Sequence, residues 1–107
     1  MPDTWGLART TEGFSAHGEV DRATAQAFEA QASAAVMEAS GPIALIDVCG
    51  VTFMDSSGIT ALIRVLELHS GKTHIVQPSR QVFMLLQLVA LTDGVLPNVE
   101  IRQPFPD

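Results

Sequence analysis

The sequence is poor in several residue types, and each shortage narrows the possible functions. It contains one cysteine, Cys49, so no disulfide can form within the chain and nothing indicates an oxidising compartment. We expect Cys49 to be a small buried apolar residue at the end of a strand. Only 6 residues are Lys or Arg, against 12 Asp or Glu, which gives a formal net charge of −6. These cations are scattered along the sequence, which disfavours direct binding to nucleic acid or to an anionic membrane surface.

Long apolar runs are also missing. No run approaches the length of a transmembrane helix, and the first residues show no basic stretch followed by an apolar block. We therefore expect a cytoplasmic protein without membrane contact. Apolar residues make up 47% of the 107 positions, which suits one compact domain over residues 1–107.

Hydrophobic periodicity predicts an α/β fold with the element order β-β-α-β-α-β-α-β. The segment 43–48 is almost continuously apolar, which is typical of a strand covered on both faces in a partly parallel sheet. We expect a small mixed β-sheet of about five strands with helices packed on it. The predicted strands are residues 4–10, 14–18, 43–48, 73–76 and 99–101.

Three helices are predicted between these strands. The first has Asp21 as its N-cap and is stopped by Gly41-Pro42. The second covers residues 56–70 and is apolar around more than half its girth, so it is either deeply buried or faces a partner. The third opens at Pro78-Ser79, with Ser79 as cap, and ends at Asp93-Gly94. From the first helix, the residues expected in the core are Phe28, Ala32, Ala35, Val36 and Ala39.

The segment Asp55-Ser56-Ser57-Gly58 lies where a buried strand turns into the second helix. Backbone N–H groups at a helix start lack partners, and the helix dipole is positive there. The position therefore accepts an anion, including a phosphate carried on a serine. The simpler interpretation is that Asp55 or Ser56 is an N-cap, and local chemistry alone favours it.

A second polar segment, Gly18-Glu19-Val20-Asp21, lies between a strand and the first helix. One interpretation is a turn whose Asp caps the helix. The other is an exposed acidic loop beside the hydroxyl-bearing segment, with both contributing to one recognition surface.

Enzymatic and metal sites have weak signals in this sequence. A hydrolase would need His17, His69 or His74 beside Ser56 or Ser57, and the G-x-S-x-G motif is absent. We expect His69 at a helix end and the other two histidines at a sheet edge or surface.

The histidines are isolated in the sequence, so no metal site is predicted. Asp47 and Asp55 would form a paired-carboxylate Mg²⁺ site only if they met, and capping and turn roles explain them more simply.

The chain resembles bacterial anti-sigma factor antagonists of the STAS domain family. The resemblance rests on Asp47 followed by residues 53–59 (F-M-D-S-S-G-I), and on residues 18–21 as the family's G-E-x-D segment before its first helix. Pro78-Ser79 opening an apolar helix that ends in residues 91–93 (L-T-D) also fits the family layout.

This resemblance implies a regulatory binding protein and no enzyme or cofactor. Members bind a serine-kinase anti-sigma factor and so free a sigma factor, a partner switching that regulates transcription, including stress responses. The kinase phosphorylates the first serine of the D-S-S-G segment, here Ser56 rather than Ser57. The phosphorylated protein no longer holds the kinase, and a serine phosphatase resets it. The partner-binding residues implied are Gly18, Glu19, Asp21, Asp55, Ser56, Ser57, Gly58, Thr60 and Arg64.

The sequence departs from the family pattern at Ile59-Thr60, where Leu-Gly is usual. The basic residues that are usual on or after the second helix are reduced to Arg64 and Lys72. Two alternatives stay open beside the antagonist. STAS-like domains also occur in stress-sensing complexes and as accessory subunits of transporters or lipid-transfer machines. A small serine hydrolase is a remote third. As an antagonist, the chain is expected to be a monomer or a weak dimer.

Overall fold

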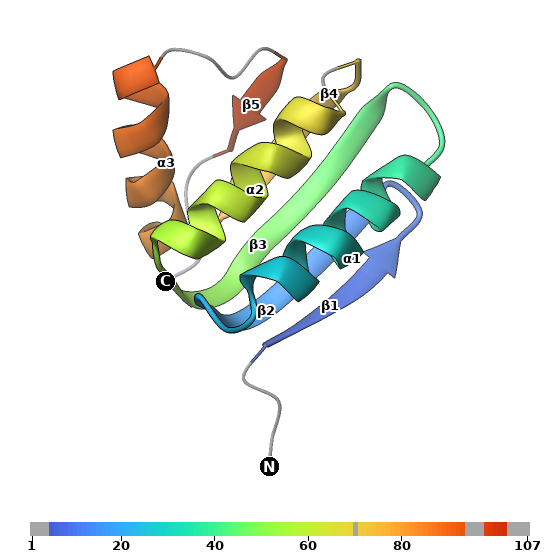
Figure 1. Ribbon diagram of the computed structural model, residues 1–107. Coiled ribbons are helices and arrows are strands. Elements are labelled where there is room, and N and C mark those ends of the chain that lie inside the picture. Colours follow the sequence, from blue (N-terminus) through green and yellow to red (C-terminus); the bar gives the residue numbers. More distant parts are fainter. Residues whose placement is uncertain (1–4, 70, 94–97, 103–107) are drawn as a thin grey trace.

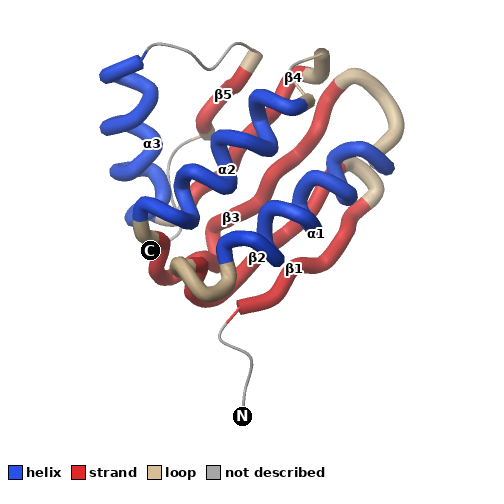
Figure 2. The backbone as a smooth tube through the Cα atoms, in the orientation of Figure 1, coloured by secondary structure: helices blue, strands red, loops and turns tan. Residues whose placement is uncertain are grey.

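The computed structural model describes residues 5–69, 71–93 and 98–102, which form a five-stranded sheet and three helices (Figure 1; Figure 2). The strands lie across the sheet in their sequence order, so neighbours along the chain are also neighbours in the sheet. The predicted element ends at Thr4, Ser70 and Gly94 lie outside the described residues. The strands are β1 (Trp5–Thr10), β2 (Gly13–Val20), β3 (Ile43–Met54), β4 (Thr73–Pro78) and β5 (Val99–Ile101).

The sheet is mixed. β1 and β2 form the predicted antiparallel hairpin, whereas β2, β3, β4 and β5 run parallel to one another. Each parallel pair is joined by one helix: α1 (Ala25–Glu38), α2 (Ser56–Leu68) and α3 (Arg80–Asp93). The observed order confirms the predicted α/β fold class. Because β2 and β3 run in the same direction, α1 and α2 begin at the same edge of the sheet (Figure 1).

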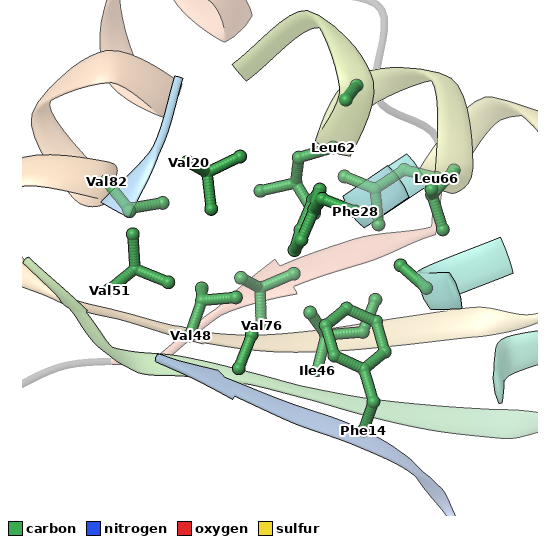
Figure 3. Packing of buried hydrophobic residues seen from close by; sticks show 14 of the residues in the cluster. Phe14, Val20, Phe28, Ile46, Val48, Val51, Leu62, Leu66, Val76 and Val82 are labelled. Carbon is green, nitrogen blue, oxygen red and sulfur yellow. The ribbon is translucent and has the colours of Figure 1, made fainter. Parts of the chain in front are cut away.

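The hydrophobic core lies between the sheet and the helices. Phe28 of α1, Leu62 of α2 and Val82 of α3 face Val48 and Val76 of the central strands, and all five are fully buried (Figure 3). Burying a side chain of this size stabilises a fold by about 1.5–3 kcal/mol relative to leaving it exposed. One continuous core therefore fixes all three helices on the sheet. The five core residues predicted for the first helix are all buried, as expected: Phe28, Ala32, Ala35, Val36 and Ala39.

Three strands are longer than predicted. β2 continues to Val20 and β3 to Met54, because these strands stay paired through Glu19↔Phe53 and Val20↔Met54. A register shift beside Gly18, whose φ is +90°, absorbs the irregularity that ended the sequence pattern. The predicted loop over residues 18–21 is therefore strand as far as Val20, and Asp21 alone lies beyond it. β4 likewise extends to Pro78, past the predicted range of 73–76.

The predicted helix caps had different outcomes. Thr24, not Asp21, is the N-cap residue of α1. Asp21 instead stabilises the turn before the helix, since its Oδ1 accepts from the N–H groups of Ala23 (3.0 Å) and Thr24 (3.2 Å). The predicted cap of the third helix is confirmed, because Ser79 Oγ accepts from the N–H of Val82 at 3.3 Å.

His74 and Cys49 lie in environments that differ from those predicted. His74 is fully buried, and neither ring nitrogen has a hydrogen-bond partner in the described part of the chain. The prediction of an edge or surface residue was wrong because strand alternation places His74 on the helix-covered face with Val76. Cys49 is only half-buried on the other face, and its Sγ lies 3.6 Å from the Gln77 carbonyl oxygen. Burial, aided by the Asp47 carboxylate, raises the pKa of the Cys49 thiol to about 11.

Within the described ranges, none of the helices has both the length and the apolar character needed to cross a bilayer.

Candidate functional site

Asp55 is the residue that caps α2. It follows the last residue of β3, and its Oδ1 accepts from the N–H groups of Ser57 (2.9 Å) and Gly58 (3.1 Å). These are two of the donors that a helix start leaves unpaired. The capping role predicted for Asp55 or Ser56 therefore falls to Asp55, and the Ser56 hydroxyl is not needed for it.

Ser56 is the first residue of α2 and is exposed, whereas Ser57 is half-buried. The backbone carbonyl of Ser56 accepts from Thr60 Oγ1 at 2.7 Å, a bond that holds the exposed Thr60 side chain against the helix. In the described part of the chain, the Ser56 hydroxyl itself makes no hydrogen bond. Of the two serines, Ser56 thus presents the more accessible hydroxyl.

Gly58 brings the first turn of α2 onto the ends of β2 and β3. A Cβ atom at this position would lie 2.6 Å from both Met54 Cγ and the Val20 carbonyl oxygen. Such separations are shorter than carbon contacts allow, so only glycine fits without a shift of the helix. Gly58 itself is buried, and its part in the site is to set the height of Ser56 and Ser57 above the sheet.

The two polar segments singled out in the sequence lie side by side in the structure. The Asp55 N–H donates to the Val20 carbonyl oxygen at 3.3 Å, and Val20 pairs with Met54. Glu19 and Asp21 are thereby placed beside the start of α2, whereas Gly18 pairs with Val51, further back along β3. Glu19 is exposed, whereas Asp21 is half-buried and uses its carboxylate in the turn before α1.

An open groove of about 980 Å³ runs between α1 and α2 on the outer side of the helix layer. Arg64 Nη1 of α2 and Glu29 Oε1 of α1 lie 3.5 Å apart across it. Ser56 and Ser57 line the groove where the helices begin, so the serines and Arg64 share one surface feature. The lining residues are Arg22, Ala25, Gln26, Glu29, Ala30, Ser33, Ala34, Met37, Glu38, Ser56, Ser57, Thr60, Ala61 and Arg64.

The three histidines are engaged elsewhere. His69 is the C-cap residue of α2, as predicted, and its Nε2 lies 3.0 Å from Ser33 Oγ. With a rise of about 1.5 Å per residue, the helix separates His69 from Ser56 by roughly 20 Å. His17 lies over Gly6, where its Cε1 would be 2.5 Å from an added Cβ, and His74 is in the core. No described histidine is placed to act as a general base for Ser56 or Ser57.

The two carboxylates considered for a metal site do not meet. Asp47 lies in the middle of β3, where it accepts from the Cys49 N–H at 3.0 Å and from Ser15 Oγ at 3.4 Å. About 26 Å of extended strand separates it from Asp55. The described residues contain no group of three or more His, Cys, Asp or Glu side chains that would hold a metal ion.

Gln81 is a contributor to the site that sequence patterns did not reveal. Its Oε1 accepts from the Met54 N–H at 2.7 Å, and its Nε2 donates to the Met54 carbonyl oxygen at 3.1 Å. Both bonds fix the residue immediately before Asp55. A glutamine in the first turn of a helix carries no distinguishing motif, so only the fold reveals this role.

Comparison with known proteins adds one positive result. A family model described as "Mlab, STAS domain" matches residues 7–98, which is most of the chain. No curated protein matches the sequence. The matched range includes Glu19 of β2, Asp55 between β3 and α2, Ser56 of α2 and Gln81 of α3.

Proposed function

The chain belongs to the STAS domain family, and from this premise we propose that it is an anti-sigma factor antagonist. In this role it binds a serine-kinase anti-sigma factor and so releases a sigma factor. The kinase transfers the γ-phosphoryl group of ATP to Ser56 Oγ, and a serine phosphatase later removes it. A new P–O bond forms at Ser56, the bond to ADP breaks, and the hydroxyl proton passes to a base on the kinase. The chain supplies only the acceptor hydroxyl, so in this role it acts as a binding protein and not as an enzyme. The proposed site of action is the cytoplasm.

The observation that carries this proposal is that Asp55 caps α2 while the Ser56 hydroxyl is left exposed. Asp55 satisfies the backbone donors of α2, and the exposed Ser56 hydroxyl has no structural task among the described residues. A kinase can therefore modify Ser56 without unfolding the helix start. The polar segment at the end of β2, with Glu19 exposed, lies next to it and extends the surface that a partner would contact.

The electrostatic effect of phosphorylation explains why binding would end. A phosphoserine adds about −1.5 to −2 charges at neutral pH. On this chain the new charge lies beside the Asp55 carboxylate, in a protein whose net charge is already −6. In a desolvated interface an unpaired charge is strongly destabilising. A partner surface that accepts a neutral hydroxyl beside a carboxylate would therefore reject a dianion there.

The fold itself should tolerate the modification. The positive end of the α2 dipole favours a nearby negative charge by about 0.3–1 kcal/mol. Asp55 keeps its bonds to the N–H groups of Ser57 and Gly58, which do not involve the Ser56 side chain. A regulatory modification should abolish partner binding and leave the domain folded, whereas a destabilising one would abolish binding by unfolding the domain.

The experiment requires the candidate serine-kinase anti-sigma factor and ATP. We expect mass spectrometry to find one added phosphoryl group on the wild type and on Ser57→Ala, and none on Ser56→Ala. Calorimetry should show that Ser56→Ala binds the kinase as wild type does, whereas Ser56→Asp binds at least tenfold more weakly. Ser40→Asp is the matched control, because Ser40 is exposed and follows the other end of α1.

Two outcomes would contradict the proposal. Equal kinase binding by the wild type and Ser56→Asp would show that charge at Ser56 does not control docking. A phosphoryl group that persists in Ser56→Ala but disappears in Ser57→Ala would move the acceptor to Ser57.

The second candidate function is that of a STAS-domain subunit in a larger assembly, such as a stress-sensing complex or a transporter. It is favoured by two exposed apolar side chains one turn apart on α3, Met84 (59% exposed) and Leu88 (67% exposed). Native mass spectrometry at micromolar concentration tests it. A large homo-assembly that Met84→Gln and Leu88→Gln dissolve together would support this candidate against the simple antagonist.

A further inference from the structure

We infer that the Arg22 guanidinium group forms an ion pair with the phosphate of phosphorylated Ser56, inside the groove between α1 and α2. This inference rests on the proposed function, because it concerns what phosphorylation of that same serine does to the domain. It assigns a role to a residue outside the two sequence motifs.

Two of the chain's 6 basic residues line the groove that also contains Ser56 and Ser57. The sequence separates Arg22 from Arg64 by a strand and a helix, and only the packing of α1 against α2 brings them to one groove. Phosphate is recognised best by guanidinium groups, whose planar donors can pair with two phosphate oxygens at once. The groove therefore offers the acceptor serine the side-chain chemistry that a phosphate needs.

Arg22 is better placed and less engaged than Arg64. Arg64 already pairs with Glu29 at 3.5 Å, and it lies eight residues after Ser56, about 12 Å further along the helix axis. Arg22 directly follows Asp21, which follows the Val20 carbonyl that accepts from the Asp55 N–H. Arg22 is exposed and, within the described residues, forms no ion pair.

The local charges make such a counter-ion necessary. The carboxylates of Asp21 and Asp55 lie near the start of α2, and each is bound to backbone N–H groups that fix its position. A phosphate dianion added to this edge meets two fixed negative charges. Arg22 lines the groove with Ser56, and its exposed side chain can move toward the phosphate.

Such an ion pair would join the two segments that form the proposed partner-binding surface, the segment after β2 and the start of α2. Arg22 belongs to the segment that follows β2, whereas Ser56 belongs to the start of α2. A bond between Arg22 and the phosphate would cover this end of the groove and withdraw one positive charge from the surface offered to the kinase. Phosphorylation would then act by closing the surface as well as by repulsion.

The test uses the full chain with phosphoserine incorporated genetically at position 56, so neither the kinase nor ATP is required. The second pKa of the phosphate is measured by ³¹P NMR during a pH titration. A nearby cation lowers this pKa because it favours the dianion. We expect Arg22→Gln to raise the pKa by about half a unit or more and Arg22→Lys to restore most of the difference.

The matched control is Arg9→Gln, which removes the same charge at the other end of β2, where Arg9 pairs with Phe14 in the sheet and with Glu38. It should leave the phosphate pKa unchanged, and circular dichroism should show the same fold for every variant. Equal pKa values in Arg22→Gln and Arg9→Gln would overturn the inference. Since no kinase takes part, that result would leave the proposed function standing, and a failed kinase assay would leave a role of Arg22 standing.

Discussion

The side-chain amide of Gln81 forms hydrogen bonds with both the backbone N–H and the backbone carbonyl of Met54, the last residue of β3. The oxygen accepts from the Met54 N–H at 2.7 Å, and the nitrogen donates to the Met54 carbonyl at 3.1 Å. β4 stops pairing with β3 at Val48↔Pro78, so no described strand lies on that side of residues 49–54. A side chain from α3 thus replaces a backbone partner one residue before Asp55, and ties the helix to the segment that presents Ser56.

Removing the two hydrogen bonds between Gln81 and Met54 should destabilise the end of β3. Gln81→Met keeps the length of the side chain but leaves the Met54 N–H and carbonyl without their partner. Each buried polar group left unpaired costs about 1–3 kcal/mol, so we expect the free energy of unfolding to fall by that order. Urea denaturation measures the loss, and hydrogen exchange of the Met54 amide should become at least tenfold faster.

The control for this prediction is Gln87→Met, the same change at an exposed position of α3. It should alter the free energy of unfolding by no more than about 0.5 kcal/mol. Equal effects of the two substitutions would show that the amide of Gln81 does not hold β3.

The close approach at Gly58 predicts a second loss of stability. In Gly58→Ala the new methyl group would lie 2.6 Å from Met54 Cγ and from the Val20 carbonyl oxygen. Met54 can shift but the β2 backbone cannot, so α2 must move away at a cost of about 1–3 kcal/mol. Gly71→Ala is the matched control, because an added Cβ there meets nothing within 4 Å. Thermal unfolding should separate the two variants, and a Gly58→Ala protein as stable as wild type would refute the contact.

These contacts show what the sequence could and could not predict. Apolar periodicity placed Ile46, Val48 and Leu62 correctly, because the side-chain repeat of an element is a local property. It ended β3 too early at Val48, because the strand continues through Gly50 only by pairing with β2. The family motif identified Ser56 but neither Arg22 nor Gln81. Arg22 meets the groove that Ser56 lines, and Gln81 meets Met54, only through the packing of the helices on the sheet, which no local pattern records.

His74 was misplaced for a related reason. Its segment has the alternation of a strand, and a histidine there is expected to face outward because a polar ring is expensive to bury. Strand alternation instead places position 74 on the same helix-covered face as Val76. The sequence does not specify which face of β4 the helices cover, and an apolar core that accepts an unpaired ring violates the usual rule.

Asp55→Ala tests the cap itself and complements the phosphorylation experiments. The substitution removes the acceptor for the N–H groups of Ser57 and Gly58, so we expect a loss of about 0.5–2 kcal/mol in the free energy of unfolding. Ser56→Ala should change it by less than about 0.5 kcal/mol, since the Ser56 side chain does not cap the helix. Chemical denaturation of both variants gives the comparison. A larger loss in Ser56→Ala than in Asp55→Ala would reverse the roles assigned to these residues.

His74 makes the stability of the domain depend on pH. Burial, with the nearby positive charges of His69 and Lys72, lowers the pKa of His74 below its ordinary value of about 6.5. Below that pH the unfolded chain binds a proton that the folded chain excludes, so acid favours unfolding. The free energy of unfolding should therefore fall by about 1.4 kcal/mol per pH unit from this source, between the unfolded and folded pKa values. Above about pH 7.5 the contribution is constant.

The substitution His74→Leu isolates this effect, because it fills the core position without a titratable group. Urea denaturation from about pH 5 to pH 8 should show the variant gaining stability relative to wild type as the pH falls. The carboxylates of the domain titrate in both proteins, so their contribution cancels in the difference. A difference that stays constant over the whole range would mean that His74 takes up its proton equally readily in the folded and unfolded chains. The buried neutral histidine would then not be the origin of acid sensitivity.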